Sequence, residues 1–196
     1  MNTTTRLTRG PALWLALFLL LLAVGFRLLR ATLLPELPNF SPVMAIALCG
    51  ALVLPRSLAT IVPLAALIVT DLLLNAAYGW PLFGPEELLR YACYGLAVAS
   101  GLSLHRLHAG TAAVFGGVTA NTLLFYIVTN TGSWLANPAY AKTPAGWFQA
   151  LTVGMPGFPP TVLFLGYSLV SNLLFTAVFL AAIRACATAQ ARPAHA

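Results

Sequence analysis

The stretch Leu37-Pro38-Asn39-Phe40-Ser41-Pro42, followed by the apolar run from Val43 to Leu54, decides the fold of this chain. From Pro42 to Leu54 a helix would be about 20 Å long, whereas the hydrocarbon core of a membrane is about 30 Å thick. If this run crosses a membrane, the sequence predicts six membrane helices with both termini on one side. If it lies at the surface or re-enters the same side, five helices remain and the termini lie on opposite sides.

The composition is that of an integral membrane protein. Of the 196 residues, 60% are apolar and 7% are charged, and the mean hydropathy is +0.88. Soluble domains are about 45–50% apolar and about 25% charged. The net charge of +6 is spread over single Lys and Arg residues at the ends of apolar runs, a pattern that orients membrane helices. We therefore expect one transmembrane domain over residues 1–196, surrounded by a lipid bilayer, with no nucleic-acid partner.

The positive-inside rule chooses between the two topologies. With six spans and a cytoplasmic N-terminus, six of the ten basic residues face inward, whereas with five spans only four do. Basic residues are enriched in cytoplasmic loops, so six spans are favoured and both termini are expected to be cytoplasmic.

The expected fold class is an all-α integral membrane protein, a bundle of six transmembrane helices of which the second is short. A short interfacial helix is expected in the loop before the last span, with Thr143 as its cap and Pro144 in its first turn. Residues 185–196 are expected to form a flexible tail. The predicted spans cover about residues 11–29, 41–54, 57–77, 87–104, 111–130 and 160–184.

Asp71 is the only acid well inside an apolar run. An unpaired Asp at the centre of a membrane helix costs about 2.5–3.5 kcal/mol on insertion scales, so a partner is expected. Arg27 and Arg30 are the candidates, and an ion pair joining the first and third helices is one interpretation. The other is a ligand contact or a cation or proton site, in which Asn75, one turn after Asp71, extends a polar pocket.

Asparagines and aromatic residues gather at the outward ends of the predicted helices. Each one alone is typical of a helix cap, an interhelical hydrogen bond or an interfacial belt. Together they form a ring around one mouth of the bundle, which favours a binding site. The candidate substrate-binding residues are Asn39, Phe40, Ser41, Asp71, Asn75, Tyr91, Tyr126, Asn130 and Trp134.

The sequence contains no pattern typical of a catalytic or metal site. Cys49, Cys93 and Cys186 lie far apart, and His105 and His108 have no further ligands nearby. A thiol of Cys49 or Cys93 binding a metal carried by the ligand is the less favoured alternative. No GxSxG, HExxH or Walker motif and no carboxylate pair is present. We expect no enzyme activity, no cofactor and no metal.

Four stretches resemble a bacterial membrane-protein family of unassigned function, and the resemblance covers about residues 25–183. That family is similar in size and six-helix plan to the substrate-binding S components of energy-coupling factor (ECF) vitamin transporters. The stretches are Leu37-Pro38-Asn39-Phe40-Ser41-Pro42-Val43, Val62-Pro63-Leu64-Ala65-Ala66 with Asp71-Leu72, Val128-Thr129-Asn130-Thr131-Gly132-Ser133-Trp134, and Thr143-Pro144-Ala145-Gly146.

The resemblance implies uptake of a vitamin-like or other micronutrient through an outward-facing pocket in the inner (plasma) membrane. It also implies a transmembrane coupling subunit with ATPases, which would contact an AxxxA patch at Ala12 and Ala16. In the last helix, where the family is expected to have Gly-Asp, this chain has Gly166-Tyr167. The alternative is a structural or assembly subunit of a membrane complex with no ligand of its own.

Overall fold

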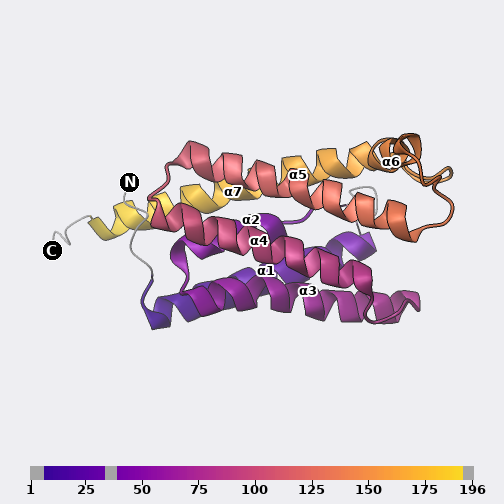
Figure 1. Ribbon diagram of the computed structural model, residues 1–196. Coiled ribbons are helices and arrows are strands. Elements are labelled where there is room, and N and C mark those ends of the chain that lie inside the picture. The colour runs from indigo at the N-terminus through magenta and orange to yellow at the C-terminus, as the bar shows by residue number, and fades with distance from the viewer. Residues whose placement is uncertain (1–6, 34–38, 192–196) are drawn as a thin grey trace.

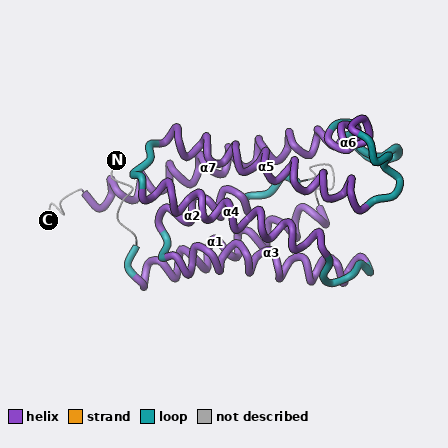
Figure 2. The backbone as a smooth tube through the Cα atoms, viewed as in Figure 1, coloured by secondary structure: helices purple, strands orange, loops and turns teal. Residues whose placement is uncertain are grey.

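The computed structural model describes residues 7–33 and 39–191, and the regular secondary structure of this part is entirely helical (Figure 2). The helices pack side by side as one elongated bundle, and the short α6 lies at one end (Figure 1). The all-α class expected from the sequence is confirmed. The helices are α1 (Arg9–Leu33), α2 (Val43–Val53), α3 (Arg56–Tyr78), α4 (Pro85–Arg106), α5 (Thr111–Ala136), α6 (Pro144–Leu151) and α7 (Thr161–Ala191).

Four helices, α1, α3, α5 and α7, are long and apolar enough to cross a membrane. The structure is therefore consistent with a helical membrane protein. Helix α2 has only 11 residues, and α4 is long but carries Glu86, Glu87 and Arg90 near its start and Arg106 at its end. The number of six crossings stays a prediction. Helix α7 continues to Ala191, beyond the expected end of the last span, and residues 192–196 lie outside the described part.

Helix α2 lies at the centre of the bundle. All of its residues from Val43 to Val53 are buried, and it packs against α3, α4 and α7. A helix that is apolar on every side has no face for water, and in this bundle the other helices surround it. Helix α4 approaches it at Gly101, where an added Cβ would overlap the carbonyl oxygen of Leu48 and lie 2.8 Å from Cβ of Ala51. The absence of a side chain at Gly101 permits this contact.

Helix α2 fills only one half of the bundle. Its 11 residues extend about 16 Å, which is far shorter than its neighbours. Its C-terminal end lies near the start of α1, where the amide of Leu7 donates to the carbonyl of Val53 at 3.0 Å. Its N-terminal end, at Val43, faces the end of the bundle that carries α6 and the α3–α4 loop (Figure 1). The space between the neighbouring helices beyond Val43 holds the cavity described next.

Candidate functional site

A cavity of about 480 Å³ lies beyond the N-terminal end of α2, a size typical of small-molecule sites. Helices α1, α3, α4, α5 and α7 line it together with the turn before α2, the first turn of α2 and the α3–α4 loop. The aromatic residues of its wall are Tyr78, Trp80, Tyr94 and Phe125. Its polar lining residues are Arg27, Asn39, Ser41, Asp71, Asn75, Arg90, Thr122, Ser168 and Asn172.

Asp71 is held by donors from two other helices. Its Oδ1 accepts a 2.6 Å hydrogen bond from Arg27 Nη2, and its Oδ2 accepts one from the Tyr91 hydroxyl at 3.1 Å. Arg90 Nη2 lies 3.6 Å from Oδ2 and donates to Glu87 Oε1 at 2.7 Å. The side chain of Asp71 is only 4% exposed, as expected for a carboxylate that depends on protein donors. The ion pair predicted between Arg27 and Asp71 is confirmed.

A second polar group on the cavity wall joins α5 and α7. Asn172 Nδ2 donates to Thr122 Oγ1 at 3.1 Å, and the Thr122 hydroxyl donates to the carbonyl of Val118 at 2.8 Å. Because the Thr122 proton is used in this way, its oxygen must accept from the amide nitrogen, which fixes the orientation of the amide. Asn172 Oδ1 is buried and has no hydrogen-bond partner among the described residues. An orphaned acceptor on a cavity wall marks a place for a donor.

The turn before α2 forms one wall of the cavity. Asn39 adopts φ of 61°, a left-handed conformation that asparagine tolerates better than most residues. Phe40 packs between Phe26 and Phe175, with ring centroids 5.9 and 6.2 Å away. The carbonyl of Ser41 accepts a 3.3 Å hydrogen bond from the Ser171 hydroxyl. These contacts fix the turn against α1 and α7. Leu37 and Pro38 lie outside the described residues.

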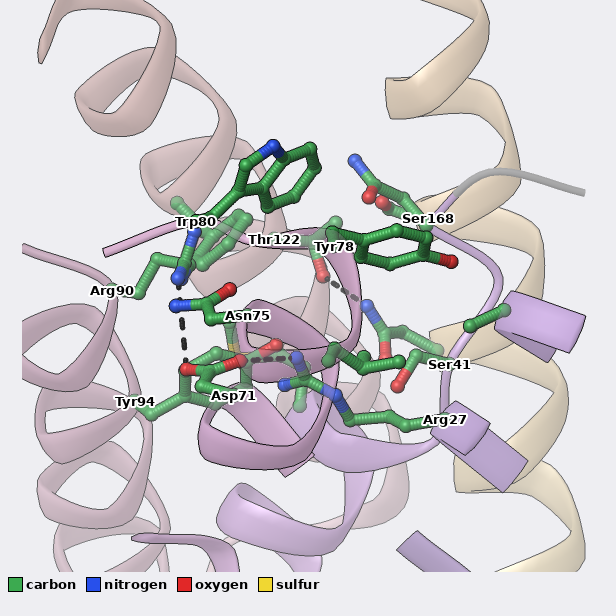
Figure 3. Close-up of a pocket in the computed structure, with 16 residues that line it drawn as sticks. Arg27, Ser41, Asp71, Asn75, Tyr78, Trp80, Arg90, Tyr94, Thr122 and Ser168 are labelled. Carbon is green, nitrogen blue, oxygen red and sulfur yellow. Dashed lines mark hydrogen bonds and ion pairs between the residues drawn. The ribbon is translucent and has the colours of Figure 1, made fainter. Parts of the chain in front are cut away.

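Aromatic rings form the rim of the cavity. The rings of Tyr78 and Trp80 lie 5.1 Å apart and are half exposed or more, and Figure 3 shows both above the Asp71 and Arg27 pair. The α3–α4 loop that carries Trp80 is fixed by Asn75, whose carbonyl accepts from the Trp80 amide at 2.8 Å and whose side-chain amide donates to the carbonyl of Pro81 at 3.0 Å. The more exposed part of the wall is therefore aromatic and the deeper part is charged.

A smaller cavity of about 170 Å³ adjoins the first between α4 and α5. Asn39, Arg90 and Phe125 line both cavities, so they stand at the boundary between them. The other lining residues of the smaller cavity are Glu86, Leu89, Thr129, Gly132 and Ser133.

Six of the nine candidate residues lie at the larger cavity or support it. Asn39, Ser41, Asp71 and Asn75 line it. The other two act through these four: Tyr91 binds Asp71, and Phe40 fixes the turn that carries Asn39 and Ser41.

The other three candidates lie away from the cavity lining. The Tyr126 hydroxyl donates to the carbonyl of Leu151 in α6, and the Asn130 amide donates to the carbonyl of Tyr126 at 2.8 Å. Trp134 Nε1 donates to the carbonyl of Ala141 at 2.8 Å. These contacts order the end of α5 and its connection to α6, so the three residues are not carried into the site proposed below.

Neither the expected partner patch nor the cysteines contribute to the cavity wall. Ala12 and Ala16 are 0% and 5% exposed and lie within the apolar core, in contact with this chain's own helices. Cys49 and Cys93 are buried free thiols. Within the described residues, no three His, Cys, Asp or Glu side chains are grouped closely enough to hold a metal ion.

Arg90 is the most important lining residue that sequence reasoning did not select. Its signal was its place in the second turn of α4, which the predicted topology puts at the same level as Asp71, beside Glu87 at a spacing of three. Thr122 and Ser168 gave no signal beyond being small polar residues in apolar helices. The side chain of Arg30, the other expected partner of Asp71, lies outside the part that the structure describes.

A family model described as a family of unknown function, DUF6580, matches residues 8–194, nearly the whole chain. No curated protein and no solved structure matched the chain. The likeness to ECF S components therefore stays a prediction. The family expected from the motifs had no assigned function, and the match agrees with that: the chain belongs to the DUF6580 family.

Proposed function

We propose that this protein binds a small molecule, a vitamin-like compound or another micronutrient, and takes part in its uptake as ECF S components do. The observation that carries the proposal is the cavity of about 480 Å³ beyond the short helix α2. It collects charged and amide side chains from separate helices at one end of an otherwise apolar bundle. A purely structural bundle has no need to leave such a space unfilled, because protein interiors are close-packed.

The proposal includes six crossings of the inner (plasma) membrane with both termini in the cytoplasm. The start of α1 and the end of α7 lie at the same end of the bundle, which supports an even number of crossings (Figure 1). In this arrangement α2 crosses only part of the bilayer. The rest of the distance is covered by the turn at residues 39–42, which lines the cavity. Irregular backbone at membrane depth is tolerated where it lines a cavity or is buried in protein.

A coupling subunit with ATPases would supply the energy for uptake. Because Ala12 and Ala16 are buried, contact with such a subunit would use the exposed face of α1. That face carries Trp14, Phe18 and Leu21, which are 75%, 60% and 62% exposed.

Blocking the cavity tests binding. Ser168 lines the cavity from α7 without a role in the ion pairs, so Ser168→Trp should fill part of the space and leave the charges in place. Ser103→Trp, at an exposed position near the far end of α4, is the matched control. Wild-type and Ser103→Trp protein should carry a co-purified small molecule that mass spectrometry detects, and Ser168→Trp protein should not. Wild-type protein that carries no such molecule and shows no thermal shift with a vitamin panel would contradict the proposal.

The alternative is a structural or assembly subunit, and the saturation of Asp71 favours it. Both carboxylate oxygens already have protein donors, as in an ion pair that only fixes helices. In that case Ser168→Trp would leave the growth and nutrient uptake of a producing cell unchanged, whereas Asp71→Asn would reduce the amount of folded protein.

A further inference from the structure

The larger cavity has unused hydrogen-bond donors rather than unused carboxylate acceptors. Asp71 is the only acid among its described lining residues, and its oxygens are held by Arg27 and Tyr91. Arg27 and Arg90 both line the cavity, and each guanidinium has five N–H donors, of which the described residues engage few. Arg90 Nε is buried without a partner among the described residues. Arg27 is paired with Asp71 and Arg90 with Glu87, so the charges balance, and what the cavity wall has in excess is N–H donors.

The start of α2 adds further N–H donors and a partial positive charge. Its N-cap residue Pro42 makes no side-chain hydrogen bond to the first turn, and Ser41 and Met44 nearby line the cavity. The amide of Val43 donates to Ser41 Oγ at 3.4 Å, so the next amides of the first turn are the ones open to a ligand. The first backbone N–H groups of a helix have no partner within the helix, and the helix dipole gives that end a partial positive charge. Acid groups bind such helix ends.

Asn172 supplies a complementary group. Its Oδ1 is an acceptor without a partner in the described structure, and Asn172 is only 5% exposed. A ligand that satisfies this oxygen must carry an N–H or O–H group.

Building on the binding function above, we propose that the ligand is a small organic acid with a hydrogen-bond donor elsewhere in the molecule. Its carboxylate or phosphate group binds Arg27, Arg90 and the N-terminal end of α2, and its donor binds Asn172. The two nearby glutamates do not line the larger cavity: Glu87 pairs with Arg90, and Glu86 lines the smaller cavity. The preference for acids is therefore expected in the larger cavity.

A metabolite mixture sorted by charge tests the inference. Carboxylic acids, phosphate monoesters, neutral amides and amines of matched size are incubated with the full chain in phosphatidylcholine nanodiscs, and retained compounds are measured by mass spectrometry. Acids should be retained at least about tenfold better than their neutral counterparts, the factor expected from one charge-assisted hydrogen bond. Better retention of amides or amines would overturn the inference while the binding function stands. Retention of no compound would overturn both.

Variants of Arg90 connect this preference to the cavity. Arg90→Gln should lower the retention of acids by about tenfold, whereas Arg90→Lys, which keeps the charge, should retain most of it. Asp71 keeps Arg27 and Tyr91 in both variants, so the fold should persist, and the thermal midpoint checks this. Arg106→Gln, at the exposed far end of α4, is the control and should change nothing. Equal retention by Arg90→Gln and wild-type protein would overturn the assignment.

Discussion

Replacement of Asp71 by leucine should destabilise the bundle mainly through Arg27. Arg90 keeps Glu87 at 2.7 Å after the change, whereas Arg27 loses its only carboxylate partner among the described residues. Removing one partner of a buried ion pair costs about 3–5 kcal/mol, and the whole of an exposed pair is worth about 0.2–1 kcal/mol. Here the two side chains are 4% and 19% exposed, and the cavity gives Arg27 some water. We therefore expect a loss of about 2–3 kcal/mol, between these limits.

The double variant Arg27→Met with Asp71→Leu is the decisive comparison. Apolar residues in place of a buried ion pair are often neutral, so it should lose less than about 1 kcal/mol and be more stable than either single variant. The free energy of unfolding is measured by titration with SDS in mixed micelles, followed by tryptophan fluorescence. Arg56→Met, at an exposed position in the first turn of α3, is the control and should change little. A double variant less stable than both single variants would refute the reasoning.

Two further predictions concern packing and the attachment of α6. Gly101→Ala should cost about 1–3 kcal/mol because the new methyl group meets the backbone of Leu48, whereas Gly95→Ala, in open space on the same helix, should be neutral or slightly stabilising. The same unfolding titration checks both variants, and equal effects would contradict the close contact. Tyr126→Phe removes the hydroxyl that donates to the carbonyl of Leu151, so it should cost about 1 kcal/mol and speed up amide hydrogen exchange in α6 alone. Unchanged exchange in α6 would show that this hydrogen bond does not hold the helix in place.

Features that depend on a few neighbouring residues or on one charge were predictable from the sequence. The run from Val43 to Leu54 has no polar face, which is typical of a helix kept from water, and the sequence favoured a short membrane span there. Asp71 within an apolar helix required a cation, and Arg27 is at the right level in the preceding long helix. Thr143 and Pro144 predicted the start of α6, where the Thr143 hydroxyl accepts a hydrogen bond from the amide of Gly146 at 3.2 Å.

The choice of cavity residues depended on the rotation of each helix about its axis. Successive residues on a helix point about 100° apart, so neighbours in sequence can face different surroundings. Thr129 lines the smaller cavity, while the side chain of Asn130 turns back to the carbonyl of Tyr126 in its own helix. An outward ring of asparagines and aromatic residues therefore contained both lining and non-lining members, and composition alone did not separate them.

The sequence by itself determined that the opening stretch introduces a short, wholly apolar helix in an all-α, membrane-type chain, because composition and run length are local properties. Only the tertiary structure decided that this helix, α2, is central and that its shortness leaves a cavity beyond Val43. It also brought Arg90 to Asp71 and Asn172 to Thr122, across separations of 19 and 50 residues. Such pairings depend on which helices adjoin and how they are rotated, and packing of the whole bundle sets both.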